Sequence, residues 1–355
     1  MADQNSITIA LDAMGGDHGP ESIIPGAALI QKEIPNIRFL IFGDEKKVAP
    51  ILAQHKALAK VSTIMHTDKY ILDKDKPSAA IRNGKDTSMR LAIEAVENGK
   101  ADAAVSGGNT GALMAMAKMI LKTLPGIHRP AICSVFPSLT GQTVMLDLGA
   151  NVLVDAENLV QFAVMGAVFA KAHRGIKDPT VGLLNVGTES SKGPDHVREA
   201  ATILATVQIP GRYIGFVEGN DITKGTVDVI VSDGYAGNIA LKAGEGVGKF
   251  AGQLFKQTMK SDPLAMVGGM LAFFALKRFK NRIDPRAYNG GVFLGLNGIC
   301  VKSHGGSDAV GVSSAIRLAA ELVQHGYVST VLNSIRELME QEAQLAAQIA
   351  QKEQA

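Results

Sequence analysis

Short turns of glycine and small polar residues follow nearly every apolar run that has the length of a buried strand. The first such turn, in ALDAMGGDHGP (10–20), contains Asp12, Gly15, Gly16 and Asp17. Similar turns lie in SGGNTGALM (106–114), LDLGANV (146–152), GLLNVGTESSKG (182–193), DGYAGNIALK (233–242) and GLNGICVKSHGGSDA (295–309). A turn of this kind that leads into a helix presents backbone N–H groups to an anion. We expect all of these turns at one edge of a parallel sheet, where they would form a site for a phosphate-like group.

Two polar side chains in these turns are candidates for catalysis. Lys192 follows LLNVGTESS and offers a cation to phosphate or to a developing oxyanion; the alternative is a solvated loop lysine. Asn238, in DGYAGNIALK, can donate a hydrogen bond to a carbonyl oxygen from the start of a helix. It can also be the N-cap of that helix, and the two roles are compatible.

His18 and His304 are the histidines that fall in glycine-rich turns. Either can exchange a proton with phosphate near neutral pH, and for each the alternative is a hydrogen bond that braces its loop. Lys302 and Ser303 precede His304 in the same turn and are candidates for substrate binding.

Other polar residues of these turns have either a structural or a binding role. Asn109 and Thr110 can cap their helix or bind phosphate. For Asp12 and Asp17 a structural role is favoured, because a carboxylate repels phosphate unless it orients a lysine or an amide. The remaining candidates for substrate binding are Gly111, Asn151, Asn185, Gly187, Arg82 and Lys85. Arg82 and Lys85 lie in the polar segment KPSAAIRNGKDTSM (76–89), for which an ordinary surface role is the alternative.

Composition indicates an ordinary globular enzyme. The chain has 355 residues, of which 46% are hydrophobic and 20% charged, and a net charge of +2 that gives no argument for nucleic acid. Cys133 and Cys300 lie in apolar runs, so buried reduced thiols are expected, and no ligand spacing indicates a metal. We find no secretion signal or membrane-spanning run and predict a cytoplasmic protein.

The alternation of apolar runs and amphipathic segments predicts an α/β fold, with a mostly parallel sheet between two layers of helices. We predict one domain over residues 1–330 and a polar helical tail over 331–355. The predicted strands are ITIALDA, IRFLIFGD, VSTIMHT, ADAAVSG, GQTVMLDLG, TVGLLNVG, YIGFVEG, DVIVSDG and GLNGICVKS.

One segment breaks this alternation. Residues 263–282 contain fourteen residues without a charge, followed at once by a basic cluster. The run is too short to span a bilayer but suits a helix lying in a membrane interface; a buried helix or a dimer contact is the alternative. We therefore predict a protruding amphipathic segment over 263–288. Its candidate contacts for membrane or a carrier protein are Met270, Leu271, Phe273, Phe274, Lys277, Arg278, Lys280 and Arg282.

These motifs, in this order from Ile7 to about Tyr327, resemble the acyl-carrier-protein:phosphate acyltransferases of bacterial phospholipid synthesis, the PlsX family. The resemblance implies transfer of a fatty acyl group from an acyl carrier protein to inorganic phosphate, giving an acyl phosphate. It also implies a Rossmann-like α/β/α sandwich related to phosphate acetyltransferases and isocitrate dehydrogenases. A homodimer, peripheral on the inner face of the membrane and without metal or cofactor, is implied as well. It points to Lys192 and Asn238 as the catalytic pair.

The residues themselves agree with direct attack by phosphate, since no turn offers an activated cysteine or a Gly-x-Ser-x-Gly elbow. Acyl carrier proteins are acidic, so the basic cluster near residue 280 suits either that partner or anionic lipid. Three alternatives stay open: a phosphate acetyl- or butyryltransferase that uses a coenzyme A thioester, an NAD-dependent dehydrogenase of the isocitrate type, and a non-catalytic membrane-attached scaffold.

Overall fold

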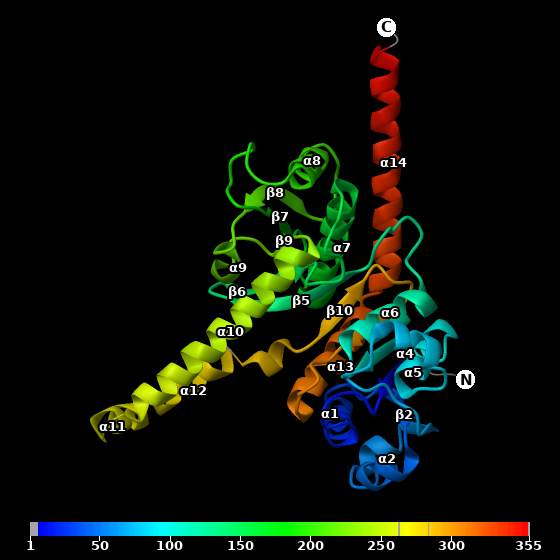
Figure 1. The fold of residues 1–355 in the computed structure, drawn as a ribbon, viewed down its shortest axis with the longest axis vertical. Helices are drawn as coiled ribbons and strands as arrows, with labels where there is room; N and C mark the ends of the chain where they lie inside the picture. Colours follow the sequence, from blue (N-terminus) through cyan, green and yellow to red (C-terminus); the bar gives the residue numbers. More distant parts are fainter. Residues whose placement is uncertain (1–5, 262, 283, 354–355) are drawn as a thin grey trace.

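The computed structural model describes residues 6–261, 263–282 and 284–353, which form one continuous sheet with helices on both faces (Figure 1). The strands are β1 (Ile7–Asp12), β2 (Ile37–Gly43), β3 (Ser62–His66), β4 (Ala103–Ser106), β5 (Ala131–Ser138), β6 (Gly141–Leu146), β7 (Thr180–Leu184), β8 (Arg212–Val217), β9 (Val229–Val231), β10 (Gly291–Leu294) and β11 (Ile299–Lys302). Their order across the sheet is β3-β2-β1-β4-β11-β10-β5-β6-β9-β7-β8. The predicted α/β class and mostly parallel sheet are confirmed.

Helices alternate with these strands along most of the described chain. They are α1 (Pro20–Glu33), α2 (Glu45–Leu52), α3 (Lys56–Ala59), α4 (Pro77–Asn83), α5 (Ser88–Glu97), α6 (Thr110–Leu121), α7 (Ala156–Arg174), α8 (Asp195–Leu204), α9 (Asp221–Lys224), α10 (Gly234–Met259), α11 (Pro263–Leu271), α12 (Phe273–Arg282), η1 (Pro285–Tyr288), α13 (Ala309–Gln324) and α14 (Tyr327–Glu353).

The two faces of the sheet carry different cores. On one face, α1, α2, α3, α7, α8, α13 and α14 share one large apolar cluster, centred on residues such as Phe39, Phe162 and Ile316. On the other face, α4, α5 and α6 cover the first half of the sheet, and α9 and α10 cover the second half. The helices of this second face therefore fall into two groups, and strands β10 and β5 lie between them.

Strand direction reverses in the middle of the sheet. β10 pairs antiparallel with both β11 and β5, and β5 pairs antiparallel with β6, whereas the pairs on either side are parallel. Three reversals turn β6, β7, β8 and β9 opposite to β1, β2, β3, β4 and β11. The expectation that all the glycine-rich turns open at one edge is therefore wrong. It failed because β5 and β10 were not predicted as strands.

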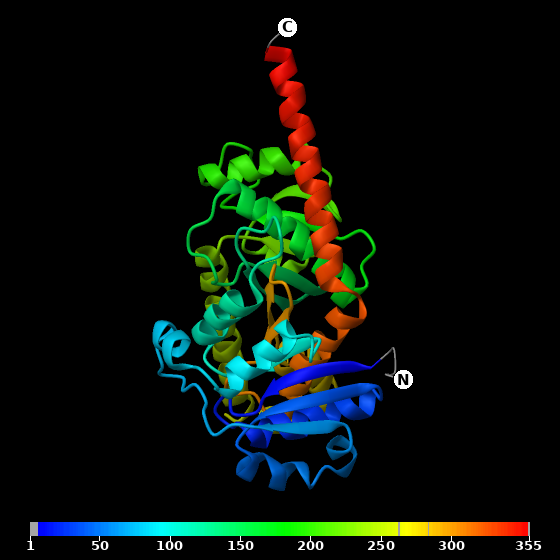
Figure 2. The same cartoon turned by 90° about the vertical axis from the view of Figure 1, so that its right-hand side faces the viewer.

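Helix α10 leaves the body after its first turns and, with α11 and α12, forms an arm (residues 234–282) that projects away from the sheet (Figure 1). Only Gly234 and Gly237 of α10 are buried. Residues 263–282 of the predicted protruding segment are the outer part of this longer arm, whereas its last residues, 284–288, lie on the chain that returns to the body. At the opposite side of the molecule, α14 packs on the body through Val331, Ile335 and Leu338 and continues beyond it (Figures 1 and 2). The division into a domain and a tail at residue 330 stays a prediction.

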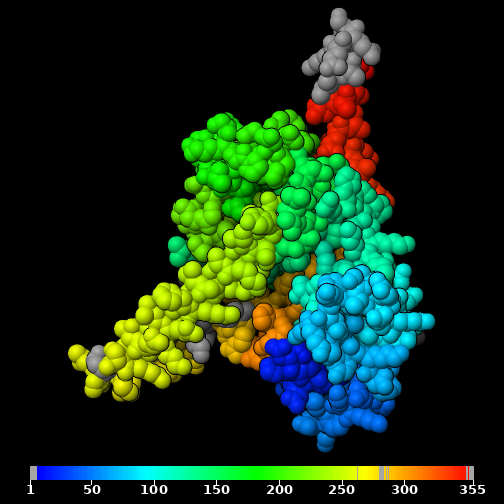
Figure 3. Space-filling model, viewed as in Figure 1, coloured from blue at the N-terminus to red at the C-terminus, as the bar shows by residue number. Residues whose placement is uncertain are grey.

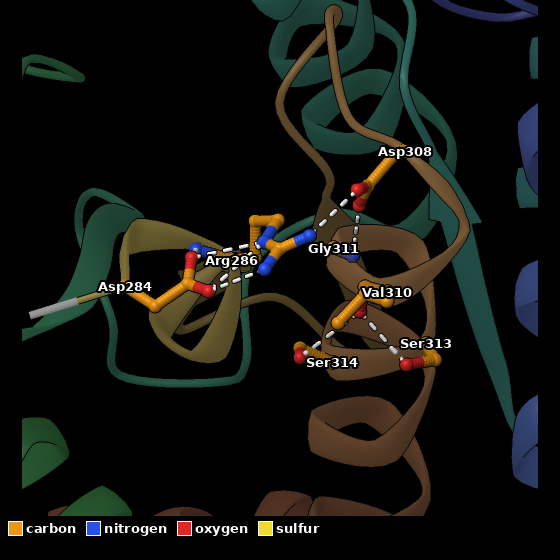
Figure 4. A network of polar contacts seen from close by, with 7 residues as sticks. All are labelled: Asp284, Arg286, Asp308, Val310, Gly311, Ser313 and Ser314. Atoms are coloured by element: carbon orange, nitrogen blue, oxygen red, sulfur yellow. Dashed lines mark hydrogen bonds and ion pairs between the residues drawn. The ribbon is translucent and has the colours of Figure 1, made fainter. Parts of the chain in front are cut away.

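The returning chain is tied to the body at the start of α13 (Figure 4). Arg286 binds the carboxylate of Asp284, with its Nη2 2.6 Å from Oδ2, and its Nη1 lies 3.0 Å from Oδ2 of Asp308. Asp308 in turn accepts a hydrogen bond from the backbone N–H of Gly311 at 3.0 Å and so is the N-cap of α13. This cap and the neighbouring Gly311 fix the helix that follows the last glycine-rich turn.

Replacing Asp308 with Ala should lower the free energy of unfolding by about 1 kcal/mol, since the cap of α13 is lost. Asp308→Asn keeps a capping oxygen and should lose much less, because asparagine caps as well as aspartate does. Urea unfolding of both variants measures the difference, provided that the dependence of the free energy of unfolding on urea concentration is the same in both. Equal losses in the two variants would mean that the ion pair with Arg286, not the cap, is what stabilises this region.

Candidate active site

The first group of turns follows the ends of β1, β4 and β11, where Asp12, Ser106 and Lys302 lie in one row of the sheet. The Oγ of Ser106 donates to Asp12 Oδ2 at 2.6 Å, and the backbone N–H of Met14 donates to its Oδ1. Asp12 is buried, and burial raises its pKa although these hydrogen bonds oppose the shift. The structural role predicted for Asp12 is supported: it holds two neighbouring turns together.

Lys302 joins the same turns from the end of β11. Its Nζ donates to the backbone oxygen of Gly107 at 3.1 Å and also to that of Ser303. Burial lowers the pKa of Lys302 to about 8, while the carboxylates of Asp73, Asp12 and Asp17 oppose this. The amine is therefore a cation at neutral pH that can give up its proton just above it.

Close approach of backbones explains two of the predicted glycines. A Cβ at Gly15 would lie 2.5 Å from Asp12 Oδ2 and 2.7 Å from the backbone nitrogen of Gly108. Gly16 has φ +88° and would bring a Cβ to 2.8 Å from the backbone oxygen of Gly305. The turns after β1, β4 and β11 thus pack directly on one another, with no room for side chains between them.

Asn289 is a residue of this region that the sequence analysis did not single out. Its Nδ2 donates to Ser303 Oγ at 2.8 Å and to the backbone oxygen of Gly311 at 2.7 Å. Its Oδ1 accepts from the backbone N–H of His304 at 2.9 Å. One amide thus fixes the turn that carries Lys302, Ser303 and His304. The turn signal AYNGGV around it was the available clue.

The histidines of these turns differ in their surroundings. His304 Nδ1 accepts from the backbone N–H of Gly306 at 3.1 Å, which supports the loop-bracing alternative for that nitrogen. His18 is exposed, and within the described part of the chain its side chain has no hydrogen bond or ion pair. The carboxylate of Asp17 lies close to Gly306, which places His18 and His304 on neighbouring turns.

Asn109 is the N-cap of α6, since its Oδ1 accepts from the backbone N–H of Ala112 at 3.0 Å. Its Nδ2 donates to the backbone oxygens of Asp73 at 2.6 Å and Asp75 at 3.3 Å. The capping role is thus supported for Asn109, and the side chain also ties segment 73–75 to the first group of turns. Thr110 and Gly111 begin α6, and Gly111 has room for the ring of Pro77.

The second group of turns follows the ends of β6, β7 and β9. After β6, the buried carboxylate of Asp147 accepts from the backbone N–H groups of Gly149, Ala150 and Asn151 at 2.7–3.1 Å. Asn151 Nδ2 donates to Asp147 and to the backbone oxygen of Pro130. The expectation that this turn offers free amides to an anion is wrong, because an aspartate of the chain already occupies them.

Lys192 lies in the turn after β7, and that turn is open to solvent. Its Nζ is 2.7 Å from Glu189 Oε1, and this hydrogen bond raises the pKa of Lys192. Asn185 Nδ2 donates to the backbone oxygen of Lys192 at 3.0 Å, so Asn185 braces the turn. A Cβ at Gly187 would lie 2.6 Å from Lys192 Cδ, so the glycine makes room for the lysine stem. Lys192 thus has a preformed support, and Glu189 is its present partner.

Asn238 lies one turn inside α10 and is exposed, with its side chain over the backbone of Gly149. The N-cap of α10 is Asp233, which accepts from the backbone N–H of Ala236 at 2.7 Å. The capping alternative for Asn238 is therefore wrong, and its amide is left for other contacts. His196 Nε2 lies 3.8 Å from Asp233 Oδ2 and so links the Lys192 loop to α10. His196 was not predicted to belong to this site, because its contact with Asp233 joins distant segments.

The two groups of turns meet near the middle of the sheet. Val301, Val292, Cys133 and Leu146 are paired across β11, β10, β5 and β6 in one row. Lys302 follows Val301 and Asp147 follows Leu146, so three strand spacings, about 15 Å, separate the two strand ends. Because these four residues face the large core, Lys302 and Asp147 point to the opposite face.

Strands β10 and β5 form the floor between the two groups of turns. On the face of Lys302 and Asp147, this floor carries Gly291, Ser134, Ile132 and Phe136, all partly accessible. Helix α10 lies on one side of the floor and the α4–α6 layer on the other, and Figure 3 shows a hollow between them. The floor lies between Lys302 of the first group of turns and Asp147 of the second. In the described chain, no three His, Cys, Asp or Glu side chains gather as metal ligands.

The remaining predicted residues lie outside this hollow. Arg82 and Lys85 are exposed on and after α4 and contact neither group of turns.

On the arm, Met270, Leu271, Phe273 and Phe274 are 56–84% exposed, and Lys277 and Arg278 are exposed beside them. The side chains of Lys280 and Arg282 lie outside the described part of the structure. No described helix is long and apolar enough to cross a bilayer. Both cysteines are buried free thiols, as predicted.

Comparison with known proteins identifies close relatives. A family model described as "Fatty acid synthesis protein" matches residues 7–330. A phosphate acyltransferase of Rhodospirillum centenum is 54% identical over 330 residues, which cover 93% of each chain. A phosphate acyltransferase of Rhodospirillum rubrum is 50% identical over 331 residues, covering 93% of this chain and 95% of that protein.

Two solved structures share the fold at low sequence identity. A phosphotransacetylase from Streptococcus pyogenes is 21% identical with a TM-score of 0.63, covering 90% of this chain and 95% of its own. The EutD phosphotransacetylase from Staphylococcus aureus is 19% identical with a TM-score of 0.61, covering 90% of this chain and 94% of its own. These likenesses confirm the predicted α/β architecture.

The lowered pKa of Lys302 predicts a pH dependence of stability. With a folded pKa near 8, the folded chain loses this proton below the pH at which the unfolded lysine does. The unfolded state then binds more protons between about pH 8 and 10, so the free energy of unfolding should rise there with pH. Lys302→Met should remove roughly 1–3 kcal/mol of that rise. Urea unfolding of the wild type and of Lys302→Met at pH 7.5 and 9.5 tests this. An equal change in the free energy of unfolding between the two pH values in both proteins would contradict it.

Proposed function

Because this chain belongs to the fatty acid synthesis protein family, whose close relatives here are phosphate acyltransferases, we propose that it transfers a fatty acyl group from an acyl carrier protein to inorganic phosphate. The product is an acyl phosphate that serves phospholipid synthesis. The observation that carries the proposal from the structure is the pair of facing turn groups. The strand ends lie about 15 Å apart across the β10–β5 floor, and phosphate and the thioester have to meet over that floor for the reaction to occur.

In the proposed reaction, an oxygen of phosphate attacks the thioester carbonyl carbon. The tetrahedral intermediate carries negative charge on the former carbonyl oxygen, and the C–S bond then breaks. The leaving thiolate takes up a proton, and the acyl group stays on phosphate. No covalent bond to the protein forms, because phosphate is the nucleophile.

We assign Lys192 and Asn238 to the charged groups of this reaction. Lys192 sits in a braced turn and can exchange Glu189 for phosphate or the oxyanion, since that ion pair is exposed and weak. The amide of Asn238 is a neutral donor at the opening of α10 that no capping contact uses. Fixed donors of this kind stabilise the developing charge. From the first group of turns, His304 Nε2 and Lys302 are the groups that we assign to accept or return a proton.

The arm favours a long-chain substrate over the short-chain coenzyme A alternative. Its tip exposes Phe273, Phe274 and Leu271 next to Lys277 and Arg278. Exposed aromatic and aliphatic side chains beside cations suit the interface of an anionic bilayer. We propose that the arm holds the protein on a membrane surface, where an acyl phosphate prone to hydrolysis can be passed on. The homodimer implied by the family resemblance stays a prediction.

The test of the function is phosphate-dependent loss of thioester from palmitoyl-acyl carrier protein, with palmitoyl phosphate as the product. Loss that needs phosphate and yields the acyl phosphate supports the proposal. A strong preference for acetyl-coenzyme A would favour the short-chain alternative. Reduction of NAD with a hydroxy acid would favour the dehydrogenase, and absence of any turnover would favour the scaffold.

Replacing Lys192 with Ala should lower kcat by at least ~100-fold, because one charge-stabilising donor is lost from the transition state. Glu189→Gln is the matched variant: it frees Lys192 of its present partner and should keep most of the activity. Steady-state rates of thioester loss measure both. Wild-type turnover in Lys192→Ala would remove this lysine from the mechanism.

Replacing both Phe273 and Phe274 with Ser should release the protein from vesicles that contain anionic lipid, because the inserted apolar area is lost. The fold should persist, since both rings are already exposed. Co-sedimentation with phosphatidylglycerol vesicles measures binding, and circular dichroism checks the fold. Unchanged sedimentation would assign these rings to another contact.

A further inference from the structure

A second cavity lies on the body of the protein, apart from the hollow between the turn groups. It has a volume of about 400 Å³ and lies between the loop after β3 and helix α4. Its lining combines apolar side chains with polar ones: Tyr70, Ile71, Leu72, Ala79 and Ala80 with Asp68, Lys69, Asp75, Asn83 and Thr87. Such a mixture suits a ligand that is itself partly apolar and partly amide or hydroxyl.

This cavity shares a wall with the first group of turns. Asn109, the cap of α6, holds the backbone oxygens of Asp73 and Asp75 with its Nδ2, and Asp75 lines the cavity. The carboxylate of Asp73 is close enough to Lys302 to raise its pKa against the effect of burial. Residues 73–75 therefore lie between the cavity and Lys302.

Exposed cations neighbour the lining residues of the cavity along the chain. Within the described chain, Lys74, Lys76, Arg82 and Lys85 are exposed and have no ion pair or side-chain hydrogen bond. Of the carboxylates of this segment, Asp86 pairs with Lys69, whereas Asp75 accepts from the backbone N–H of Leu72 at 2.9 Å and keeps its negative charge. Segment 68–87 has five cations and four carboxylates, so its net charge is +1, and four of its cations are exposed and unpaired within the described chain.

We propose that segment 68–87 is the docking surface for the acidic carrier protein, with the pantetheine arm in the cavity and the thioester delivered toward Lys302 and the hollow. This inference rests on the proposed function and names the place where its acyl donor binds. Pantetheine, with two amides, a hydroxyl and a dimethyl carbon, matches the mixed lining. The surface cations match an acidic protein.

The other basic surface, on α12, suits this partner less well. Lys277 and Arg278 lie on the arm, which projects away from the sheet and its turns in Figure 1. Their neighbours Phe273 and Phe274 are exposed, which favours lipid over a soluble acidic protein. The two basic surfaces thus have different occupants: the carrier protein on α4 and the bilayer on the arm.

The experiment compares palmitoyl-acyl carrier protein with palmitoyl-pantetheine, which lacks the protein. In Lys74→Glu/Lys76→Glu, the KM for the carrier-bound substrate should rise about 10-fold at low salt and less at high salt, because exposed charges act mainly on encounter. The KM for palmitoyl-pantetheine should change less than 2-fold. Lys56→Glu/Lys60→Glu makes the same charge change on exposed lysines of another surface and should match the wild type for both substrates.

A cavity-filling variant tests the second half of the proposal. Ala79→Trp should raise the KM for both thioesters about 10-fold and leave the KM for phosphate unchanged. Anisotropy of fluorescently labelled carrier protein measures docking without turnover. A chain that binds the carrier on α4 but releases no thioester would contradict the proposed function and leave the docking site intact.

Three results would overturn the docking site. The first is wild-type KM and wild-type carrier affinity in Lys74→Glu/Lys76→Glu. The second is an equal rise of KM for both thioesters in that variant, which would mean a disturbed active site. The third is a 10-fold loss of carrier affinity in Lys277→Glu/Arg278→Glu without vesicles, which would move the carrier to the arm.

Discussion

The reversal of strand direction at β10 and β5 is the constraint on which the rest of the structure depends. In a sheet that was parallel throughout, all the glycine-rich turns would lie along one edge, side by side. Here the antiparallel pairs turn the second half of the sheet around, and the row from Val301 to Leu146 brings the two sets of strand ends to within about 15 Å. Two partly accessible strands are left as a floor, over which two substrates can meet.

The glycine-rich turns differ in which residues form hydrogen bonds with their backbone groups. After β6, the carboxylate of Asp147 takes three N–H groups, so this turn is a rigid support for Asn238. After β1 and β4, Asp12 and Lys302 hold the turns against each other. The turn after β7 is the most open, and it carries Lys192. Rigid turns thus surround one solvent-facing cation, which is an arrangement suited to exchanging a surface ion pair for an anionic substrate.

Much of the fold could be predicted from the chain because apolar runs and turn residues are local signals. The nine predicted strands are present. The failures have one physical cause, namely that strand pairing is not local. β10 is four residues long, and β5 contains Pro137, so neither reads as a central strand. Missing these two strands also hid the reversal and, with it, the true relation between the turns.

For the site, the sequence identified residue types better than their partners. Lys192, Asn238 and Lys302 were singled out, but Asn289, His196 and the amide-binding role of Asp147 depend on contacts between distant segments.

The most direct test of the proposed anion site is a crystal of the full chain soaked in thiophosphate, whose sulfur can be located by anomalous scattering. We expect the anion over the β10–β5 floor, within hydrogen-bonding distance of Lys192 or Asn238. An anion found only on the arm or on α4, with the floor empty, would contradict it.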